Sequence, residues 1–245
     1  MSKDFVSNVI HPLIFWIKAT GKGAAMIKGA IFDVDGTLLN SMPVWENLGE
    51  LYLKSVGVEA EPGLGEELSA MSLPQGADYL IQHYHLGKTR NKVLDGINQQ
   101  VRDFYAQKVP LKPGVRDFLE GLREYRIPMV IVTSSDRGNV EAALKRLGVM
   151  NFFDGMLTCT EMGTDKNRPD IYLAASLQLD TEPWETLVFE DAYHAVLTAK
   201  KYGFRTVAVY DEANDGKLGK IWNTADIYLS EYADFDLFWR RVSKL

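Results

Sequence analysis

Six short, largely apolar runs recur along the chain from residue 30 onward, each bounded by polar or turn-forming residues. They are AIFDVD at 30–35, PMVIVT at 128–133, GMLTC at 155–159, TLVFED at 186–191, RTVAVY at 205–210 and DIYLS at 226–230. Continuous apolar runs, without a polar residue at every second position, are typical of parallel strands covered on both faces. The pattern therefore predicts six buried parallel strands.

Apolar residues at helical spacing fill most of the intervals between these runs. Such stretches occur at 113–125, 137–149, 169–179 and 193–203. Pro113 and Pro169 stand at the start of two of them, where proline fits because the first N–H groups of a helix have no partner within it. Strand and helix alternate, which predicts an α/β fold built on a doubly wound parallel sheet.

One interval, residues 42–110, breaks this alternation. Helical patterns occur at 43–58, 74–86 and 89–109, and the interval contains no strand pattern. We predict that residues 42–110 form an inserted α-helical cap domain. Residues 26–41 and 111–245 would then form the α/β core together.

The first 25 residues precede this core and form an N-terminal extension of unknown role. An apolar cluster at 13–17 is too short to span a bilayer, and His11 and Pro12 interrupt the segment. No small-residue cleavage site follows, so a secretory signal is not expected either. We expect an amphipathic lead helix or a misassigned start, with Met26 as the candidate functional start.

Charge and cysteine content narrow the choice of partners. The 245 residues carry a formal charge of -6, and their lysines and arginines form no run, which argues against a nucleic-acid partner. Cys159 is the single cysteine and cannot form an internal disulfide, which suits a reducing cytoplasm. We expect a cytoplasmic monomer or weak homodimer that acts on a small molecule and not at a membrane.

Polar residues gather where the predicted strands end, and a lysine lies in the loop before one helix. Taken one at a time, each has an ordinary explanation as a turn residue, a helix cap or a solvated side chain. In an open parallel sheet, however, the carboxyl ends of the strands meet along one edge, where ligands bind. We therefore expect one polar cluster made of Asp33, Asp35, Thr133, Ser134, Lys166, Glu190 and Asp191.

This set of side chains suits phosphoryl transfer. Oxygen ligands with few nitrogens or sulfurs favour Mg²⁺, and we expect Asp33, Asp191 and Glu190 to supply or support its site. A carboxylate can attack phosphorus and form an aspartyl-phosphate when a metal screens the repulsion between the two anions. A second carboxyl group two residues along, Asp35, can protonate the leaving alcohol and later deprotonate water. No cofactor beyond the metal is needed.

Four segments, in this order, closely resemble the motifs of the haloacid dehalogenase (HAD) superfamily. They are DVDGT at 33–37, VIVTSS at 130–135, KNRPD at 166–170 and FED at 189–191, and the resemblance covers about residues 27–210. It implies a Rossmann-like α/β core. It also makes residues 42–110 similar to the class I cap, which closes over the substrate and selects it.

The resemblance also implies a role for each residue of the cluster. Asp33 would be the nucleophile and a metal ligand, and Asp35 the general acid and base, with its backbone carbonyl on the metal. Glu190 and Asp191 would complete the Mg²⁺ site. The phosphate group would be bound by Thr133, Ser134 and Lys166.

Within the superfamily, the chain resembles β-phosphoglucomutase-like and phosphoglycolate phosphatase-like proteins. Dehalogenases lack the second aspartate of the first motif, so Asp35 indicates phosphate chemistry. Mutases of the family carry a histidine at the cap hinge and an arginine in the cap, whereas here Trp45 stands near the histidine position and SAMSLPQG at 69–76 contains no arginine. These departures favour a phosphatase that acts on a small phosphorylated metabolite, such as a sugar phosphate or phosphoglycolate.

Two other functions stay open at this point. One is a phosphomutase, in which the aspartyl-phosphate is transferred back to a sugar phosphate instead of to water. The other is a catalytically silent binding or regulatory protein that has kept the fold. The intact set of Asp33, Asp35, Lys166 and Asp191 argues against the silent protein.

Overall fold

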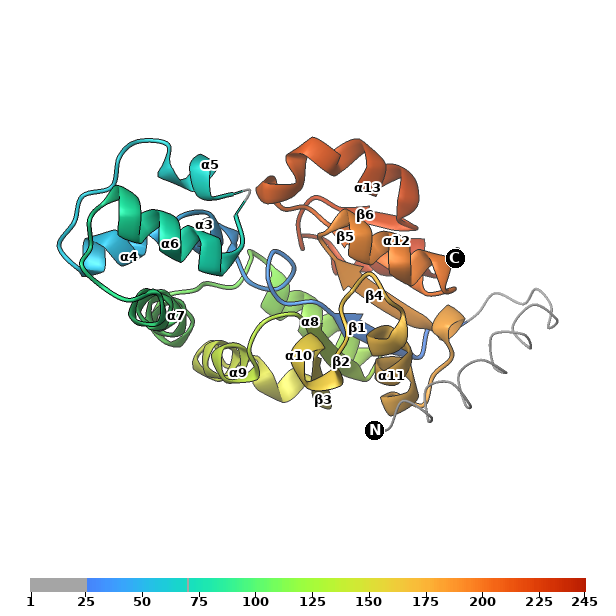
Figure 1. The fold of residues 1–245 in the computed structure, drawn as a ribbon. Coiled ribbons are helices and arrows are strands. Elements are labelled where there is room, and N and C mark those ends of the chain that lie inside the picture. The colour runs from blue at the N-terminus through green and yellow to red at the C-terminus, as the bar shows by residue number, and fades with distance from the viewer. Residues whose placement is uncertain (1–25, 70) are drawn as a thin grey trace.

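The computed structural model describes residues 26–69 and 71–245, and a six-stranded parallel sheet lies at the centre of the described chain (Figure 1). The strand order is β3-β2-β1-β4-β5-β6, with every neighbouring pair parallel. The six predicted strands and the α/β fold class are therefore confirmed. The strands are β1 Gly29–Phe32, β2 Met129–Thr133, β3 Gly155–Thr158, β4 Thr186–Glu190, β5 Arg205–Val209 and β6 Ile227–Leu229.

Both faces of the sheet are covered by helices, which explains why its strands are apolar throughout. Phe32 of β1 packs in the cluster formed with α8 (Val115–Glu124), α9 (Arg137–Arg146) and α14 (Phe235–Val242). Ile31 points to the other face and packs with α11 (Asp170–Gln178) and α12 (Tyr193–Lys201). Adjacent residues of one strand thus belong to two different core layers.

Four core helices, α8, α9, α11 and α12, match the predicted helical stretches to within a few residues. Other elements of the core were not predicted. These are helices α10 (Cys159–Met162) and α13 (Leu218–Thr224), helix α14, and the 3₁₀ segments η2 (Met150–Phe152), η3 (Pro183–Glu185) and η4 (Glu212–Lys217).

The chain between β1 and α8 is helical and forms a lobe beside the sheet (Figure 1). Its own hydrophobic cluster includes Tyr52, Leu80 and Ile97. The last helix of the lobe also reaches the core, because Tyr105 packs in the main cluster of the sheet. The division of the chain at residues 42 and 110 stays a prediction. The helices are α3 Met42–Glu46, α4 Leu48–Ser55, α5 Leu64–Leu68, α6 Leu73–His83 and α7 Arg90–Gln107.

The expectations about residues 1–25, including a start at Met26, concern a segment outside the described residues. Within 26–69 and 71–245, no helix combines the length and the apolar character that crossing a membrane requires.

Candidate active site

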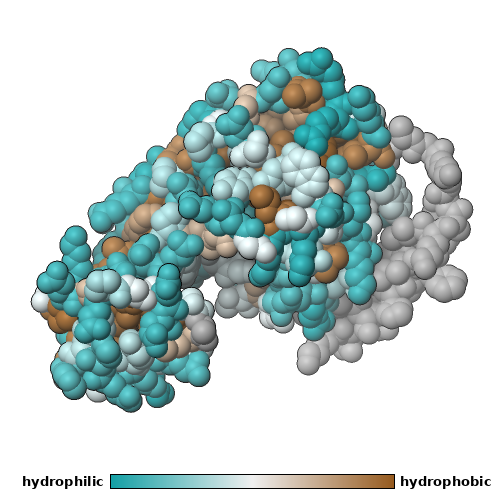
Figure 2. Space-filling model, turned by 90° about the horizontal axis from the view of Figure 1, so that it is seen from above, coloured by the Kyte–Doolittle hydropathy of each residue, from teal (hydrophilic) through white to brown (hydrophobic). Residues whose placement is uncertain are grey.

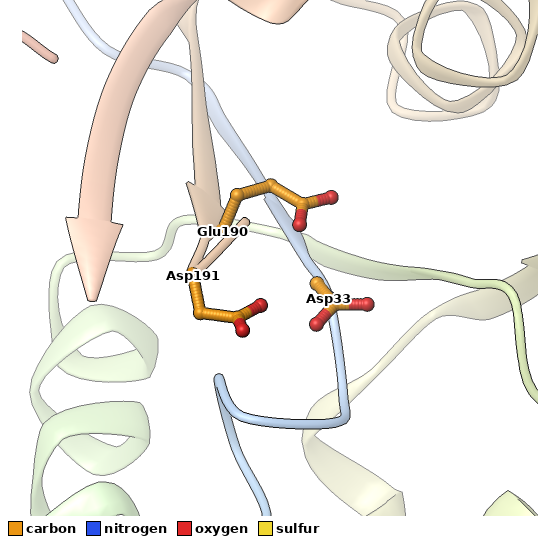
Figure 3. A group of neighbouring side chains, drawn as sticks. All are labelled: Asp33, Glu190 and Asp191. Carbon is orange, nitrogen blue, oxygen red and sulfur yellow. The ribbon is translucent and has the colours of Figure 1, made fainter. Parts of the chain in front are cut away.

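Three acidic side chains meet at the carboxyl ends of two adjacent strands. Asp33 follows β1, and Glu190 ends β4 with Asp191 directly after it. Because β1 and β4 pair in parallel with Phe32 opposite Phe189, the residues that follow are brought side by side. All three side chains are buried, and each offers an oxygen within 4.8 Å of the others (Figure 3).

Lys166 joins this group from the loop between α10 and α11. Its Nζ lies 2.8 Å from Glu190 Oε1 and also donates to Asp33 Oδ1, and the side chain is buried. Burial acts to lower the pKa of Lys166, but the carboxylates of Asp33 and Glu190 outweigh it and raise the pKa. The lysine is therefore a fixed positive charge inside the acidic group.

The acidic group holds more negative charge than this one lysine balances. Burial raises the pKa of Glu190 to about 8; Lys166 opposes this shift, and repulsion from Asp33 and Asp191 adds to it. The pKa of Asp191 is also raised, first by burial and then by Asp33. Buried carboxylates in mutual repulsion are stabilised by a divalent cation, and oxygen donors of this kind fit Mg²⁺. The described residues thus fit the predicted metal.

Neighbouring side chains hold the carboxylates of Glu190 and Asp191 in place. Tyr172 on α11 donates its hydroxyl proton to Glu190 Oε1 at 2.7 Å. Asn214 donates from Nδ2 to Asp191 Oδ2 at 2.7 Å, and Thr37 donates to Asp191 Oδ1 at 3.4 Å. Tyr172 and Asn214 were not predicted, since neither belongs to a recognisable motif and both act through a single polar atom.

Gly36 explains why a glycine follows the second aspartate. Its φ angle is +79°, in the left-handed region that side chains disfavour. A Cβ atom at this position would also lie 2.5 Å from Asp191 Oδ2. The glycine therefore lets the loop after β1 approach the acidic group of β4.

Asp35 lies apart from the acidic group, half-buried and held by three hydroxyl groups. Oδ1 accepts from Ser41 at 2.6 Å and from Tyr105, and Oδ2 accepts from Ser135 at 2.5 Å. Burial and then repulsion from Asp33 raise the pKa of Asp35, and the three hydroxyls oppose this shift. A carboxyl with a raised pKa carries a proton more readily at neutral pH, as a general acid must.

The predicted phosphate-binding hydroxyls differ in their surroundings. Thr133 ends β2, is fully buried, and its Oγ1 accepts from the backbone N–H of Ser135 at 3.0 Å. Ser134 is exposed, with its Oγ 3.4 Å from Cys159 Sγ. The next residue, Ser135, is the one that reaches Asp35. Roles of Thr133 and Ser134 in binding phosphate stay predictions.

Comparison with known proteins identifies the family. The family model described as haloacid dehalogenase-like hydrolase matches residues 30–209, which is more than half of the chain. The chain therefore belongs to the haloacid dehalogenase-like hydrolases, as the four motifs predicted.

Curated relatives of the chain include named phosphatases. The chain is 26% identical over 192 residues to the phosphorylated carbohydrates phosphatase of Thermotoga maritima, covering 78% of this chain and 89% of that protein. It is 28% identical over 191 residues to the validoxylamine A 7'-phosphate phosphatase of Streptomyces hygroscopicus subsp. limoneus, covering 75% and 86%. Both relatives are named phosphatases, in agreement with the enzyme class predicted from the sequence.

Solved structures show the same fold. A β-phosphoglucomutase from Clostridium difficile superposes with a TM-score of 0.62 at 18% identity, covering 89% of this chain and 98% of that one. A HAD family hydrolase from Deinococcus radiodurans, with bound phosphate and sodium, gives a TM-score of 0.69 at 20% identity, covering 90% and 98%. At these identities the likeness concerns the fold alone.

Proposed function

We propose that the protein is a Mg²⁺-dependent phosphomonoester hydrolase that acts on a phosphorylated carbohydrate through an aspartyl-phosphate. The observation that carries the proposal is the meeting of Asp33, Glu190 and Asp191 with the buried Lys166 at one sheet edge. A further carboxyl group, Asp35, stands two residues after the proposed nucleophile and is held by three hydroxyls. Nucleophile, cation and proton carrier are thus present together.

In the first step, a carboxylate oxygen of Asp33 attacks phosphorus, and the bond from phosphorus to the ester oxygen breaks. Asp35, carrying a proton, donates it to the departing alkoxide. In the second step, Asp35 as a carboxylate accepts a proton from water while that water attacks phosphorus. The aspartyl-phosphate bond breaks, and Asp33 is regenerated with inorganic phosphate as the product.

The other residues of the site would neutralise the negative charge of the substrate's phosphate group. Mg²⁺, held by Asp33, Asp191 and Glu190, would neutralise the anionic oxygens of the phosphate and orient it. Lys166 offers a second cation that burial and two carboxylates keep protonated. We further propose that residues 42–110 act as the cap that encloses the substrate, with Thr133 and Ser134 facing its phosphate.

The substrate class is supported by the relatives, and we propose that a cavity in the helical lobe receives the leaving group. The two phosphatases described above are named for a carbohydrate phosphate and for validoxylamine A 7'-phosphate. The cavity has a volume of about 700 Å³, large enough for a sugar-sized leaving group. It is lined in part by Trp45, which is joined to Asp35 through Tyr105.

A panel of phosphorylated metabolites tests the proposal. Glucose 6-phosphate, fructose 1-phosphate, sorbitol 6-phosphate and phosphoglycolate would be incubated with the protein and Mg²⁺, and both free phosphate and isomerised product would be measured. We expect phosphate release that stops with EDTA and returns with Mg²⁺. Isomer without phosphate would identify a mutase, and neither product would favour the silent binding protein.

The Asp33→Asn variant excludes a contaminating phosphatase and tests the nucleophile. An amide of the same shape cannot attack phosphorus, so we expect turnover to fall on the order of 10⁴-fold or more. Circular dichroism should show an unchanged fold, since Glu190 still pairs with Lys166. Substantial activity in this variant would exclude Asp33 as the nucleophile.

A further inference from the structure

Two hydrogen bonds connect the first helix of the cap lobe to Asp35. Trp45 on α3 donates its indole Nε1–H to the Tyr105 hydroxyl oxygen at 3.2 Å, and that hydroxyl donates to Asp35 Oδ1. The two rings also pack edge to face, with their centroids 6.4 Å apart. Tyr105 is fully buried, whereas Trp45 is 38% exposed. These two hydrogen bonds thus connect a residue at the surface of the lobe to the carboxyl group of Asp35.

The order of donors in this chain is fixed by chemistry. An indole N–H can only donate, while a tyrosine hydroxyl has one proton and can also accept. Because Trp45 donates to the Tyr105 oxygen, the tyrosine proton is directed at Asp35. A hydroxyl that already accepts one hydrogen bond is also a stronger donor in the next.

This arrangement distinguishes the two oxygens of Asp35. Oδ1 accepts from two hydroxyls, Ser41 and Tyr105, whereas Oδ2 accepts only from Ser135. Oδ1 is thus held by two donors and Oδ2 by one, so the orientation of the carboxyl group is set mainly at Oδ1.

We infer that Trp45 and Tyr105 are positioning residues that fix the orientation of the Asp35 carboxyl group. The inference rests on the proposed function, because it assigns a purpose to contacts of the proposed general acid. It also gives Trp45 a role besides packing. A movement of α3 would change the geometry at Asp35 through this one chain of contacts.

The test compares two aryl phosphates of similar shape. Phenol is a poor leaving group that needs a proton from the enzyme, whereas p-nitrophenol departs readily as its anion. The value of kcat/KM depends on the steps from substrate binding to departure of the alcohol. A difference in kcat/KM between the two substrates therefore reports how well the enzyme protonates the leaving group. Phenyl phosphate and p-nitrophenyl phosphate would be assayed with Mg²⁺ for the wild type and each variant.

Tyr105→Phe removes the hydroxyl and keeps the ring. We expect kcat/KM for phenyl phosphate to fall about tenfold to a hundredfold, and that for p-nitrophenyl phosphate to fall less than about threefold. Tyr52→Phe is the matched control, because Tyr52 is also buried in the lobe and its hydroxyl has no partner among the described residues. It should leave both values unchanged.

Trp45→Phe removes the indole donor and keeps an aromatic ring, at a position 38% exposed, where the smaller ring should let the variant fold. We expect a selective loss on phenyl phosphate of about threefold, in the same direction as for Tyr105→Phe. Equal losses on both substrates, or no loss in either variant, would overturn the inference while leaving the phosphatase in place. A wild type that hydrolyses no phosphomonoester would instead refute the proposed function.

Discussion

A buried ion pair supports the loop that carries Asp33 and Asp35, the proposed catalytic residues. Lys112 Nζ lies 2.8 Å from Asp211 Oδ2 and donates to the carbonyl oxygen of Gly36 at 2.6 Å. The Lys112 side chain is 13% exposed and that of Asp211 6%. The pair thus ties the loop after β1 to the segment after β5, where Asp211 stands three residues before Asn214.

Replacing Lys112 by methionine would leave Asp211 as an unpaired buried charge. We expect Lys112→Met to lower the free energy of unfolding by about 3 kcal/mol. The double variant Lys112→Met/Asp211→Asn should recover much of this loss, because asparagine removes the charge and can still accept from the N–H of Ala213. Urea denaturation would measure both values. A loss below about 1 kcal/mol for Lys112→Met would contradict the argument.

Among single residues, the sequence predicted those that belong to motifs. It missed those that contribute one hydrogen-bonding atom from outside any motif. Asp33, Glu190, Asp191 and Lys166 come together as expected. Tyr105, by contrast, sits at a buried position of an amphipathic helix and cannot be told from a packing residue before its hydroxyl is located. Only the folded chain brings that hydroxyl to Asp35, 70 positions away in the sequence.

The elements of the core were predictable in proportion to their length and burial. Each strand covered on both faces is a continuous apolar run, and a helix such as α8, with 10 residues, spans enough turns to show its period. Helix α13 has 7 residues, about two turns, which is too few for a clear periodic signal. Helix α14 has an amphipathic pattern over its 8 residues that the prediction missed. Their positions follow from packing, as when Phe238 of α14 joins the main core cluster.

Two glycines in helices of the lobe offer a contrasting test of packing between elements. Gly96 of α7 faces Tyr52 of α4 so closely that a Cβ would lie 2.4 Å from the tyrosine ring. Gly76 of α6 has room, since a Cβ there would meet Leu68 at 3.6 Å.

We expect Gly96→Ala to destabilise the fold by about 1–3 kcal/mol, because the ring must move out of a packed cluster. Gly76→Ala should stabilise it by about 1 kcal/mol through helix propensity. Thermal unfolding of both variants beside the wild type would show opposite changes. A Gly96→Ala variant as stable as the wild type, or more stable, would mean that α4 and α7 do not pack this closely.

At the scale of the whole molecule, the helical lobe and the sheet with its helices form two lobes, and the face shown in Figure 2 is largely hydrophilic on both. The cavity of this proposed cap, about 700 Å³, lies within the smaller lobe and is lined in part by Glu46, Glu50 and Glu66. No lysine, arginine or histidine is among its described lining residues. If this cavity receives the leaving group, as we propose, its lining offers no cation for a second anionic group.

This charge pattern predicts a preference for substrates whose leaving group is uncharged. A carboxylate several ångströms from an anion costs roughly 1 kcal/mol at the dielectric of a partly solvated cavity, so three acids together should disfavour an anion by about tenfold or more. Fructose 1-phosphate and fructose 1,6-bisphosphate differ only in the second phosphate group. We expect kcat/KM for the monophosphate to be higher by that factor.

A triple Glu46→Gln/Glu50→Gln/Glu66→Gln variant tests whether these acids cause the preference. Glutamine keeps the size of the side chain and removes the charge, so the gap between the two substrates should narrow to a few-fold. Glu124→Gln, a change of equal charge at the end of α8, should leave the gap unchanged because screening weakens charges beyond about 10 Å. If the bisphosphate is the better substrate of the wild type, its second phosphate must be bound by cations outside the cap cavity, and the lobe does not select substrates by charge.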